Sequence, residues 1–277
     1  MTASVAEQNQ INPPAPLRIF DAHTHAFPDA IAGRAVEALS RKADIPSFHD
    51  GTFLGLTAYE SRAEGFLLLP IATKAAQTHT VNRWAVERAG GKAKVFGSIH
   101  PLCDHWAEQL DFLRAHGVKG IKMHPEYQDF YVDDPALFPL YEGLFDRHMI
   151  LYLHAGVDIG FPPPVHGSPQ RIARLCERFP AGRIIAAHMG GYLQYEQAKD
   201  CLLGRDNLWI DTSFAAQRMP KEQLRAFLRL QGKRALFGTD APWADFDEAL
   251  NAVLHAGLEE TELANLLYHN AMALLEG

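Results

Sequence analysis

Residues 17–25, which read LRIFDAHTH, form a short apolar run that ends in an Asp-x-His-x-His motif. Alternate side chains of a β-strand point the same way, so His23 and His25 can reach one metal ion. Alone the motif is weak, because 14 histidines in 277 residues produce such a pair by chance. Its position at the end of an apolar run makes it informative about the fold.

The same arrangement recurs along the chain, where short apolar runs alternate with longer stretches of helical spacing. This alternation predicts a parallel sheet, because parallel neighbours need a crossover that is usually helical. Eight runs in a chain near the roughly 250 residues of a (β/α)8 barrel favour a closed TIM barrel, with an open doubly wound sheet as the alternative. The runs are Leu17–Phe20, Phe66–Ala72, Lys94–Ile99, Val118–Met123, Met149–Leu153, Arg183–Ala187, Leu208–Asp211 and Ala235–Gly238.

The chain is expected to form a single α/β domain over residues 17–277, with an extra C-terminal helix over 259–276. Other helices are predicted between the runs, among them 29–43 and 104–116, the latter with Asp104 as N-cap. The first 16 residues are polar and then Pro-rich, which predicts a disordered lead or a clamp onto a neighbour. This lead and the last helix leave a homodimer open.

The composition excludes several classes of function. The chain carries 26 Lys and Arg against 33 Asp and Glu, a net charge of −7, and no basic stretch for nucleic acid. No apolar run approaches the roughly 18 residues of a membrane span, and no secretory signal is visible. Three distant cysteines predict no disulfide framework and favour a reducing cytoplasm. Motifs for ATP, nicotinamide or serine-hydrolase chemistry are absent.

Polar residues gather where the predicted strands end, and in a barrel those ends share the face that carries the active site. Six of the eight strands finish in His25, His100, His124, His154, His188 or Asp240. Together His23, His25, His154 and Asp240 predict a site for Zn²⁺ or another divalent ion. His188 is expected to be a further ligand or to orient water.

Further residues are expected near the mouth of the barrel, where they could contact a small-molecule substrate. Tyr127 follows His124, and Phe161 and His166 lie in a stiff Pro-rich loop. Trp243 follows the last predicted strand. Rigid loop packing is the alternative interpretation for the loop residues, and His124 is weighed evenly between the site and a structural role.

Lys122 alternates with apolar neighbours that are expected to pack on helices, which points its side chain into the barrel. A lysine in a barrel interior needs a partner. Three interpretations compete: a salt bridge in the core, an anchor for a substrate carboxylate, and a modified lysine that bridges two metals. The anchor and the structural pair are favoured.

These motifs together resemble the amidohydrolase superfamily, and within it the amidohydrolase-2 group of metal-dependent TIM barrels. The resemblance spans residues 17–275 and is specific for the superfamily but not for a substrate. It rests on Asp21-x-His23-x-His25, His154 in LHAG, His188 in AHMGG, Asp240 in FGTDAPW and the C-terminal Tyr268-His269-Asn270-Ala271.

The resemblance implies that His23, His25, His154 and Asp240 hold one divalent metal, Zn²⁺ in the first place, with Mn²⁺, Fe²⁺ or Co²⁺ as alternatives. It implies that His188 binds or orients water or substrate, and that Asp240 doubles as the general base. Binuclear relatives carry a bridging Lys or Glu at the fourth strand. Here that region reads Lys-Met-His over 122–124, which speaks against a second metal.

Three functions are open at this stage. The leading hypothesis is metal-assisted hydrolysis of an amide, a lactone or a related bond in a small carboxylate-bearing substrate. The second is non-oxidative decarboxylation of an unsaturated or aromatic acid on the same metal. The third is a non-catalytic barrel that binds a metal or a ligand.

Overall fold

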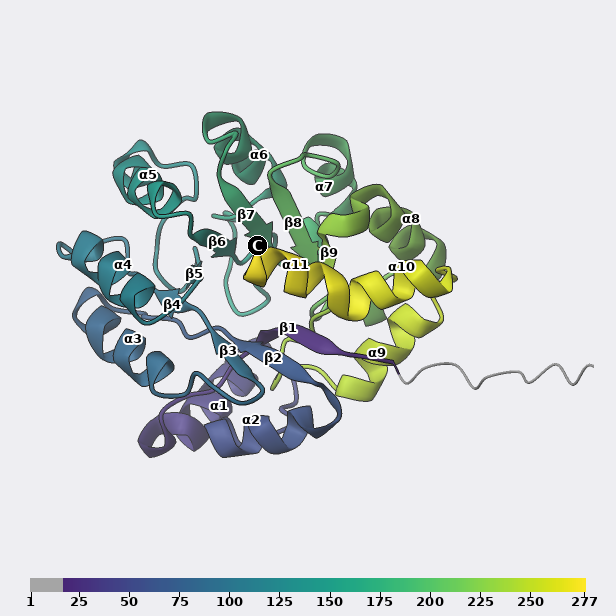
Figure 1. The fold of residues 1–277 in the computed structure, drawn as a ribbon, viewed down its shortest axis with the longest axis horizontal. Coiled ribbons are helices and arrows are strands. Elements are labelled where there is room, and N and C mark those ends of the chain that lie inside the picture. The colour runs from purple at the N-terminus through teal and green to yellow at the C-terminus, as the bar shows by residue number, and fades with distance from the viewer. Residues whose placement is uncertain (1–16) are drawn as a thin grey trace, which may run out of the picture.

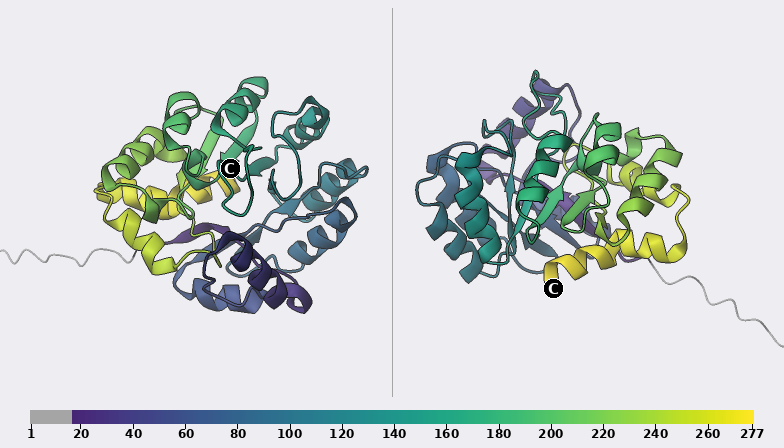
Figure 2. Two further views of the ribbon diagram at one scale, coloured as in Figure 1. Left: turned by 180° about the vertical axis from the view of Figure 1, so that it is seen from behind. Right: turned by 90° about the horizontal axis from the view of Figure 1, so that it is seen from above.

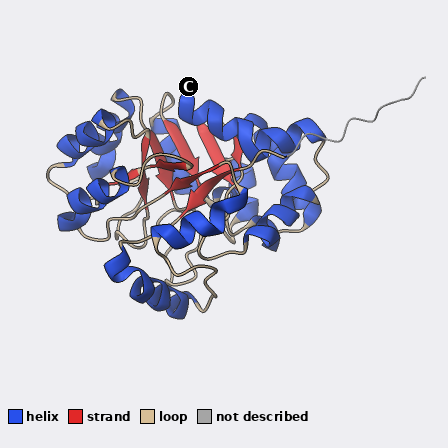
Figure 3. Cartoon of the chain, turned by 60° about the horizontal axis from the view of Figure 1, so that its bottom comes forward, coloured by secondary structure: helices blue, strands red, loops and turns tan. Residues whose placement is uncertain are grey.

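The structure, a computed structural model, describes residues 17–277, so the predicted lead over residues 1–16 lies outside the described residues. Short parallel strands occupy the centre and helices surround them (Figures 1 and 3). The strands are β1 (Phe20–Thr24), β2 (Gly65–Leu68), β3 (Ala93–Val95), β4 (Gly97–Ser98), β5 (Gly120–Met123), β6 (Ile150–Leu153), β7 (Arg183–Ala186), β8 (Leu208–Asp211) and β9 (Ala235–Leu236).

The strands follow one another in chain order, in one sheet from β1 to β3 and another from β4 to β9. β3 and β4 are two pieces of one predicted strand, and the Phe96 N–H between them donates to the Leu68 carbonyl at 3.0 Å. At the other seam the Ala22 N–H donates to the Phe237 carbonyl at 2.8 Å. Sequential order without a reversal identifies the predicted (β/α)8 barrel and not the open sheet.

The helices cover the outside of the barrel (Figure 1). Most of their bounds differ from the predicted ones only near the ends, but the helix over Phe53–Tyr59 was not predicted. The helix predicted over 29–43 is confirmed, whereas the one predicted over 104–116 begins at Trp106, with His105 and not Asp104 as N-cap. The helices are α1 (Asp29–Ala43), α2 (Phe53–Tyr59), α3 (Thr78–Val86), α4 (Trp106–Ala115), α5 (Phe138–Asp146), α6 (Pro169–Arg178), α7 (Tyr195–Cys201), α8 (Lys221–Gln231), α9 (Phe246–Leu254), α10 (Glu260–Ala264) and α11 (Asn270–Glu276). None of these described helices is long and apolar enough to cross a membrane.

The expected C-terminal helix is present but interrupted. A π-helical turn over Asn265–His269 separates α10 from α11. α11 lies across one end of the barrel, and α1 stands at the opposite end (Figure 2). Leu274 and Leu275 of α11 join the cluster that fills the barrel interior, together with strand residues such as Phe20 and Tyr152. One end of the barrel is therefore closed by a packed helix, and a site can open only at the other.

Two carboxyl groups, those of Asp21 in β1 and Glu60 before β2, lie next to each other and are fully buried. Asp21 Oδ1 accepts from the His23 N–H at 2.9 Å and the Thr239 N–H at 3.0 Å, but Oδ2 and both Glu60 oxygens lack hydrogen-bond partners. Burial raises the pKa of Asp21 to about 7. Burial and the Asp21 charge raise the pKa of Glu60 well above its ordinary value.

This pair predicts a loss of stability as pH rises. A carboxyl group whose pKa is raised by folding stabilises the fold below its unfolded pKa, and that contribution is lost as pH rises through the folded value near 7. Glu60→Gln should reduce the fall in melting temperature between about pH 6 and about pH 8.5, because the amide adds a donor without a charge. Glu64→Gln, at an exposed carboxylate, is the control and should leave the fall unchanged. Equal falls in all three proteins would contradict this account.

Candidate metal centre

Three of the predicted ligands meet at the end of the barrel opposite α11. His23 lies in β1, His25 follows that strand, and Asp240 follows β9. His23 Nε2 and His25 Nε2 are 3.1 Å apart, and Asp240 Oδ1 lies 3.3 Å from the first and 3.2 Å from the second. All three side chains are buried. One side-chain atom from each residue therefore converges on a single point away from bulk water.

The hydrogen bonds on the far side of each ring fix which nitrogen carries the proton. His23 Nδ1 lies 3.0 Å from Asp211 Oδ2, and His25 Nδ1 lies 2.7 Å from the Leu69 carbonyl oxygen. Both oxygens can only accept, so each Nδ1 donates and each neutral ring keeps a lone pair on Nε2. Burial and the nearby Lys122 charge lower the pKa of His23 to about 3, which favours its neutral ring.

Two imidazole lone pairs and a carboxylate oxygen thus face one another without a proton between them. The third donor is the Asp240 carboxylate, whose charge interacts with that of the nearby Lys122 ammonium group. Tetrahedral ligands at bond lengths of about 2.0–2.1 Å lie about 3.3 Å apart. The observed separations of 3.1, 3.2 and 3.3 Å therefore fit a divalent cation.

His154 and His188 form a hydrogen-bonded pair beside these three ligands. His188 Nδ1 donates to the Ser213 carbonyl at 3.0 Å, so its Nε2 accepts from His154 Nδ1 at 3.0 Å. This leaves His154 Nε2 buried and without a partner. His154 forms a cluster with His124 and Asp158 and not with the three ligands above. Its role as the fourth ligand therefore stays a prediction, although the free nitrogen is available to a metal or a substrate.

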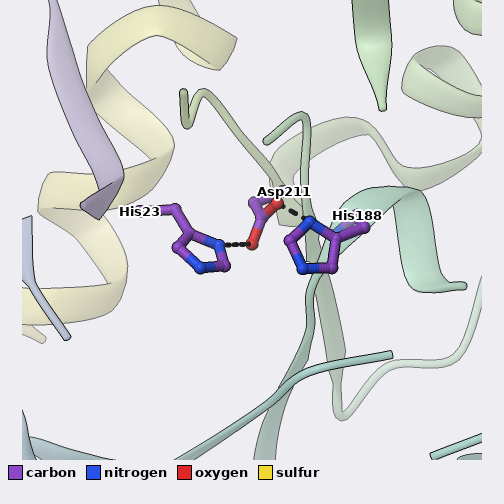
Figure 4. Close-up of side chains that lie close together, drawn as sticks. All are labelled: His23, His188 and Asp211. Atoms are coloured by element: carbon purple, nitrogen blue, oxygen red, sulfur yellow. Dashed lines mark hydrogen bonds and ion pairs between the residues drawn. The ribbon is translucent and has the colours of Figure 1, made fainter. Parts of the chain in front are cut away.

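Asp211, at the end of β8, connects the two histidine groups and was missed by the sequence analysis. Its carboxylate lies between the rings of His23 and His188 (Figure 4). It accepts from His23 Nδ1, from the His188 N–H at 3.0 Å, and from the hydroxyls of Tyr152 and Ser213. Burial raises the pKa of Asp211, but His23 and the other donors outweigh it and hold the pKa below its ordinary value. The available signal was its position: it ends a predicted strand, like the ligands.

Lys122 in β5 points into the barrel and reaches the metal centre. Its Nζ lies 3.3 Å from His23 Nε2 and 4.5 Å from the centre of the Tyr152 ring. Burial lowers its pKa to about 8, against the opposing charges of Asp211 and Asp240. The ammonium group therefore borders the site without a carboxylate in direct contact.

A cavity of about 490 Å³ opens onto the metal centre. Lys122, His124, Tyr127 and Trp243, all predicted to contact substrate, line it. The His124 ring stacks on His154 with ring centres 4.1 Å apart, and its Nε2 lies 3.3 Å from Asp158 Oδ2. These side chains form a polar region beside the metal centre, while the rest of the lining is largely apolar.

The two residues of the Pro-rich loop lie elsewhere. Neither Phe161 nor His166 is among the described residues that line the cavity. Phe161 packs against the ring of Tyr127, with ring centres 4.9 Å apart, and Lys42 lies over its outer face. The His166 ring packs on Tyr131, with centres 4.4 Å apart. These contacts are compatible with the loop packing considered above, and contact of Phe161 and His166 with a substrate stays a prediction.

The sequence matches the amidohydrolase family over residues 20–277, which is nearly the whole chain and includes every predicted ligand. The chain belongs to this family. Its members are enzymes, so the non-catalytic barrel considered above is set aside for this amidohydrolase. No functionally curated protein sequence matches it significantly.

Solved structures share the fold of this amidohydrolase at low sequence identity. A 5-carboxyvanillate decarboxylase from Sphingomonas paucimobilis has a TM-score of 0.65 at 18% identity, over 94% of this chain and 99% of that one. A dihydroxybenzoic acid decarboxylase from a Polaromonas species, with bound manganese and 2-nitroresorcinol, has a TM-score of 0.68 at 14% identity, over 94% and 97%. A putative 2-pyrone-4,6-dicarboxylic acid hydrolase from Pseudomonas putida has a TM-score of 0.64 at 16% identity, over 94% and 98%.

The converging lone pairs predict that the purified amidohydrolase carries about one divalent ion per chain and that His23→Ala loses it. Elemental analysis of protein prepared without chelator measures both. His105→Ala, at an exposed histidine outside the site, is the matched control and should keep the ion. About two ions per chain would indicate a second site, and no ion after reconstitution would contradict the metal centre.

Asp211 predicts a weaker effect through the orientation of His23. Asp211→Asn removes the charge that holds the Nδ1 proton, and losing such a partner typically lowers metal affinity by about 10- to 100-fold. Competition against a chromophoric chelator measures this change. Asp206→Asn changes an exposed carboxylate that pairs with Arg234 and should leave the affinity unchanged. An unchanged metal affinity in Asp211→Asn would contradict the role of Asp211 in orienting His23.

Proposed function

We propose that this amidohydrolase is a metal-dependent carboxy-lyase that releases CO₂ from an aromatic or unsaturated acid without oxidation. The observation that carries the anionic substrate of this proposal is the Lys122 ammonium group, which is buried beside His23 in a largely apolar cavity. A buried cation without a carboxylate partner suits an anionic group of a substrate. The two decarboxylases of the same fold support this reaction class.

The reaction exchanges one substituent on carbon for another. The bond between the carboxyl carbon and the ring or alkene carbon breaks, and its electron pair stays on that carbon. A proton then takes the place of the CO₂ that leaves, so no oxidant or reductant is needed. The chain must therefore bind an anion, exclude water and hold a proton near the reacting carbon.

Each of these tasks has a candidate residue. Lys122 binds the anionic group, and the aromatic side chains of Tyr127 and Trp243 contact the ring and exclude water. His188 and His154 share one proton across 3.0 Å beside the cavity and can hold it for transfer to carbon. Asp240, the predicted general base, is the second candidate for proton transfer, since it borders both the ligands and the cavity.

The ligands in this proposal are His23, His25 and Asp240, with His154 as the fourth. A divalent ion bound there supplies positive charge that holds an anionic substrate oxygen and stabilises negative charge as the bond breaks. Zn²⁺ is the proposed ion from its preference for nitrogen and oxygen ligands, and Mn²⁺, Fe²⁺ and Co²⁺ suit the same donors. The manganese in the Polaromonas relative supports the inclusion of Mn²⁺.

Hydrolysis, the leading hypothesis from sequence, remains the second candidate. The family name and the pyrone dicarboxylic acid hydrolase of the same fold favour it. In that reaction Asp240 takes a proton from the attacking water and passes it to the leaving group. Lys122 suits a carboxylate-bearing lactone or amide equally well, so binding of an anion does not separate the two reactions.

We also propose a cellular location and a partner for this amidohydrolase. The three cysteines, Cys103, Cys176 and Cys201, are free in the described chain, which agrees with the proposed cytoplasmic location. The proposed partner is a small-molecule substrate. A homodimer stays a prediction.

Isotope labelling separates the two reactions. The metal-loaded enzyme is incubated in H₂¹⁸O with hydroxybenzoates, unsaturated dicarboxylic acids and a pyrone dicarboxylic acid, and the organic products are analysed by mass spectrometry. A carboxy-lyase releases CO₂, and its organic products contain no ¹⁸O from the water. Products that gain ¹⁸O without loss of CO₂ would establish hydrolysis and overturn the proposal.

Substitution of Lys122 tests the observation that carries the proposal. Lys122→Met keeps the bulk of the side chain but removes the charge, so KM for a carboxylate substrate should rise by about 10- to 150-fold, as for other hydrogen bonds to charged groups. Metal content should stay at the wild-type value. Loss of metal in this variant would instead favour the interpretation of Lys122 as a bridging ligand, and an unchanged KM would leave it a structural residue.

A further inference from the structure

The cavity extends well beyond the metal centre, and its far wall is one face of α1. Ile31, Ala35, Ala38 and Leu39 line the cavity at the spacing of a single helical face. Ala32 and Val36, which point to the core, are the buried residues of this helix. α1 therefore has an apolar face that the protein itself leaves uncovered.

Other elements continue this apolar wall. Ile71 after β2 and Trp84 of α3 line the same cavity. The wall is thus formed by Ile31, Ala35, Ala38, Leu39, Ile71 and Trp84, and we call it the α1 wall. Uncovered apolar surface of this extent, continuous with a polar reacting centre, is typical of a ligand site.

The two ends of the cavity differ in chemistry. At one end are the histidines, Asp240 and Lys122, which suit an anionic head group. Lys122 is the one lysine or arginine among the described residues that line the cavity, so no second cation is available at the α1 wall. A charged group placed at the α1 wall would lie against apolar surface without a cation, which is unfavourable.

We infer that the substrate of this site carries an apolar extension, an alkyl chain or a further ring, that lies along the α1 wall while its anionic group lies at the metal centre. This inference rests on the proposed function for the position of the anionic group. It makes α1 a determinant of specificity: the small side chains of Ala35 and Ala38 leave room for the extension, and Ile31 and Leu39 contact it.

Binding of n-alkyl hydroxamates to the metal-loaded enzyme tests this inference without turnover. These probes carry one metal-binding head group and chains of increasing length, and calorimetry gives their Kd values. Each methylene that reaches the α1 wall should lower Kd by about threefold to fourfold, the equivalent of about 0.8 kcal/mol. A flat dependence on chain length would overturn the inference.

Two substitutions should abolish this dependence. Ala35→Phe and Ala38→Phe fill the space beside α1, so the long hydroxamates should lose their advantage while acetohydroxamate keeps its wild-type Kd. Both positions are partly or fully exposed, so the fold tolerates the larger side chain. Ala30→Phe is the matched control, since Ala30 is an exposed residue of α1 that does not line the cavity. If Kd depends on chain length in both variants as it does in the wild type, the inference is also overturned.

A neutral dye without a metal-binding group distinguishes failure of this inference from failure of the proposed function. N-phenyl-1-naphthylamine fluoresces in apolar sites, and it should bind the wild type and Ala30→Phe but bind Ala35→Phe more weakly. Dye binding with no hydroxamate binding would refute the metal centre and keep the α1 wall. If hydroxamates bind with a Kd that does not depend on chain length, the α1 wall is refuted and the metal centre is kept.

Discussion

Three electron-pair donors converge at the open end of this barrel, and none of the three atoms carries a proton. The Nε2 atoms of His23 and His25 and an oxygen of Asp240 lie 3.1–3.3 Å apart, and the fold holds them there by bonding the far side of each imidazole. Such an arrangement is unfavourable unless a cation lies among the three atoms. Packing of the rest of the barrel on both faces of β1 offsets this energetic cost.

The backbone around the site is held in conformations that non-glycine residues rarely adopt. His188 and Asp240 have φ values of 56° and 76°, and Met189 follows at 60°. Residues in this region cost about 1–3 kcal/mol each and persist where the surroundings determine them. Here the His188 N–H donates to Asp211, and the Asp240 N–H donates to the His23 carbonyl at 2.9 Å. The first of these hydrogen bonds joins the residues after β7 to β8, and the second joins the residues after β9 to β1.

The sequence predicted the parts of this structure that depend on local pattern. Alternation of apolar runs and helices indicated the barrel, and the polar residues after the runs indicated which end carries the site. The position of Asp211 at the end of its run pointed to the site, but its role could not be predicted, because that role arises from contacts with His23 and His188, which are distant in sequence. The uncovered face of α1 was equally hidden, since an apolar stripe on a helix ordinarily predicts core packing.

The placement of α11 has a consequence for how the chain is made. Leu274 and Leu275 fill the inside of the barrel together with side chains of β1 and β6, so the interior is incomplete until the residues of α11 have left the ribosome. Earlier segments can form strands and helices during synthesis, but their inward faces stay open to water. Such a chain depends on rapid completion, or on a chaperone that shields those faces, to avoid association with other nascent chains.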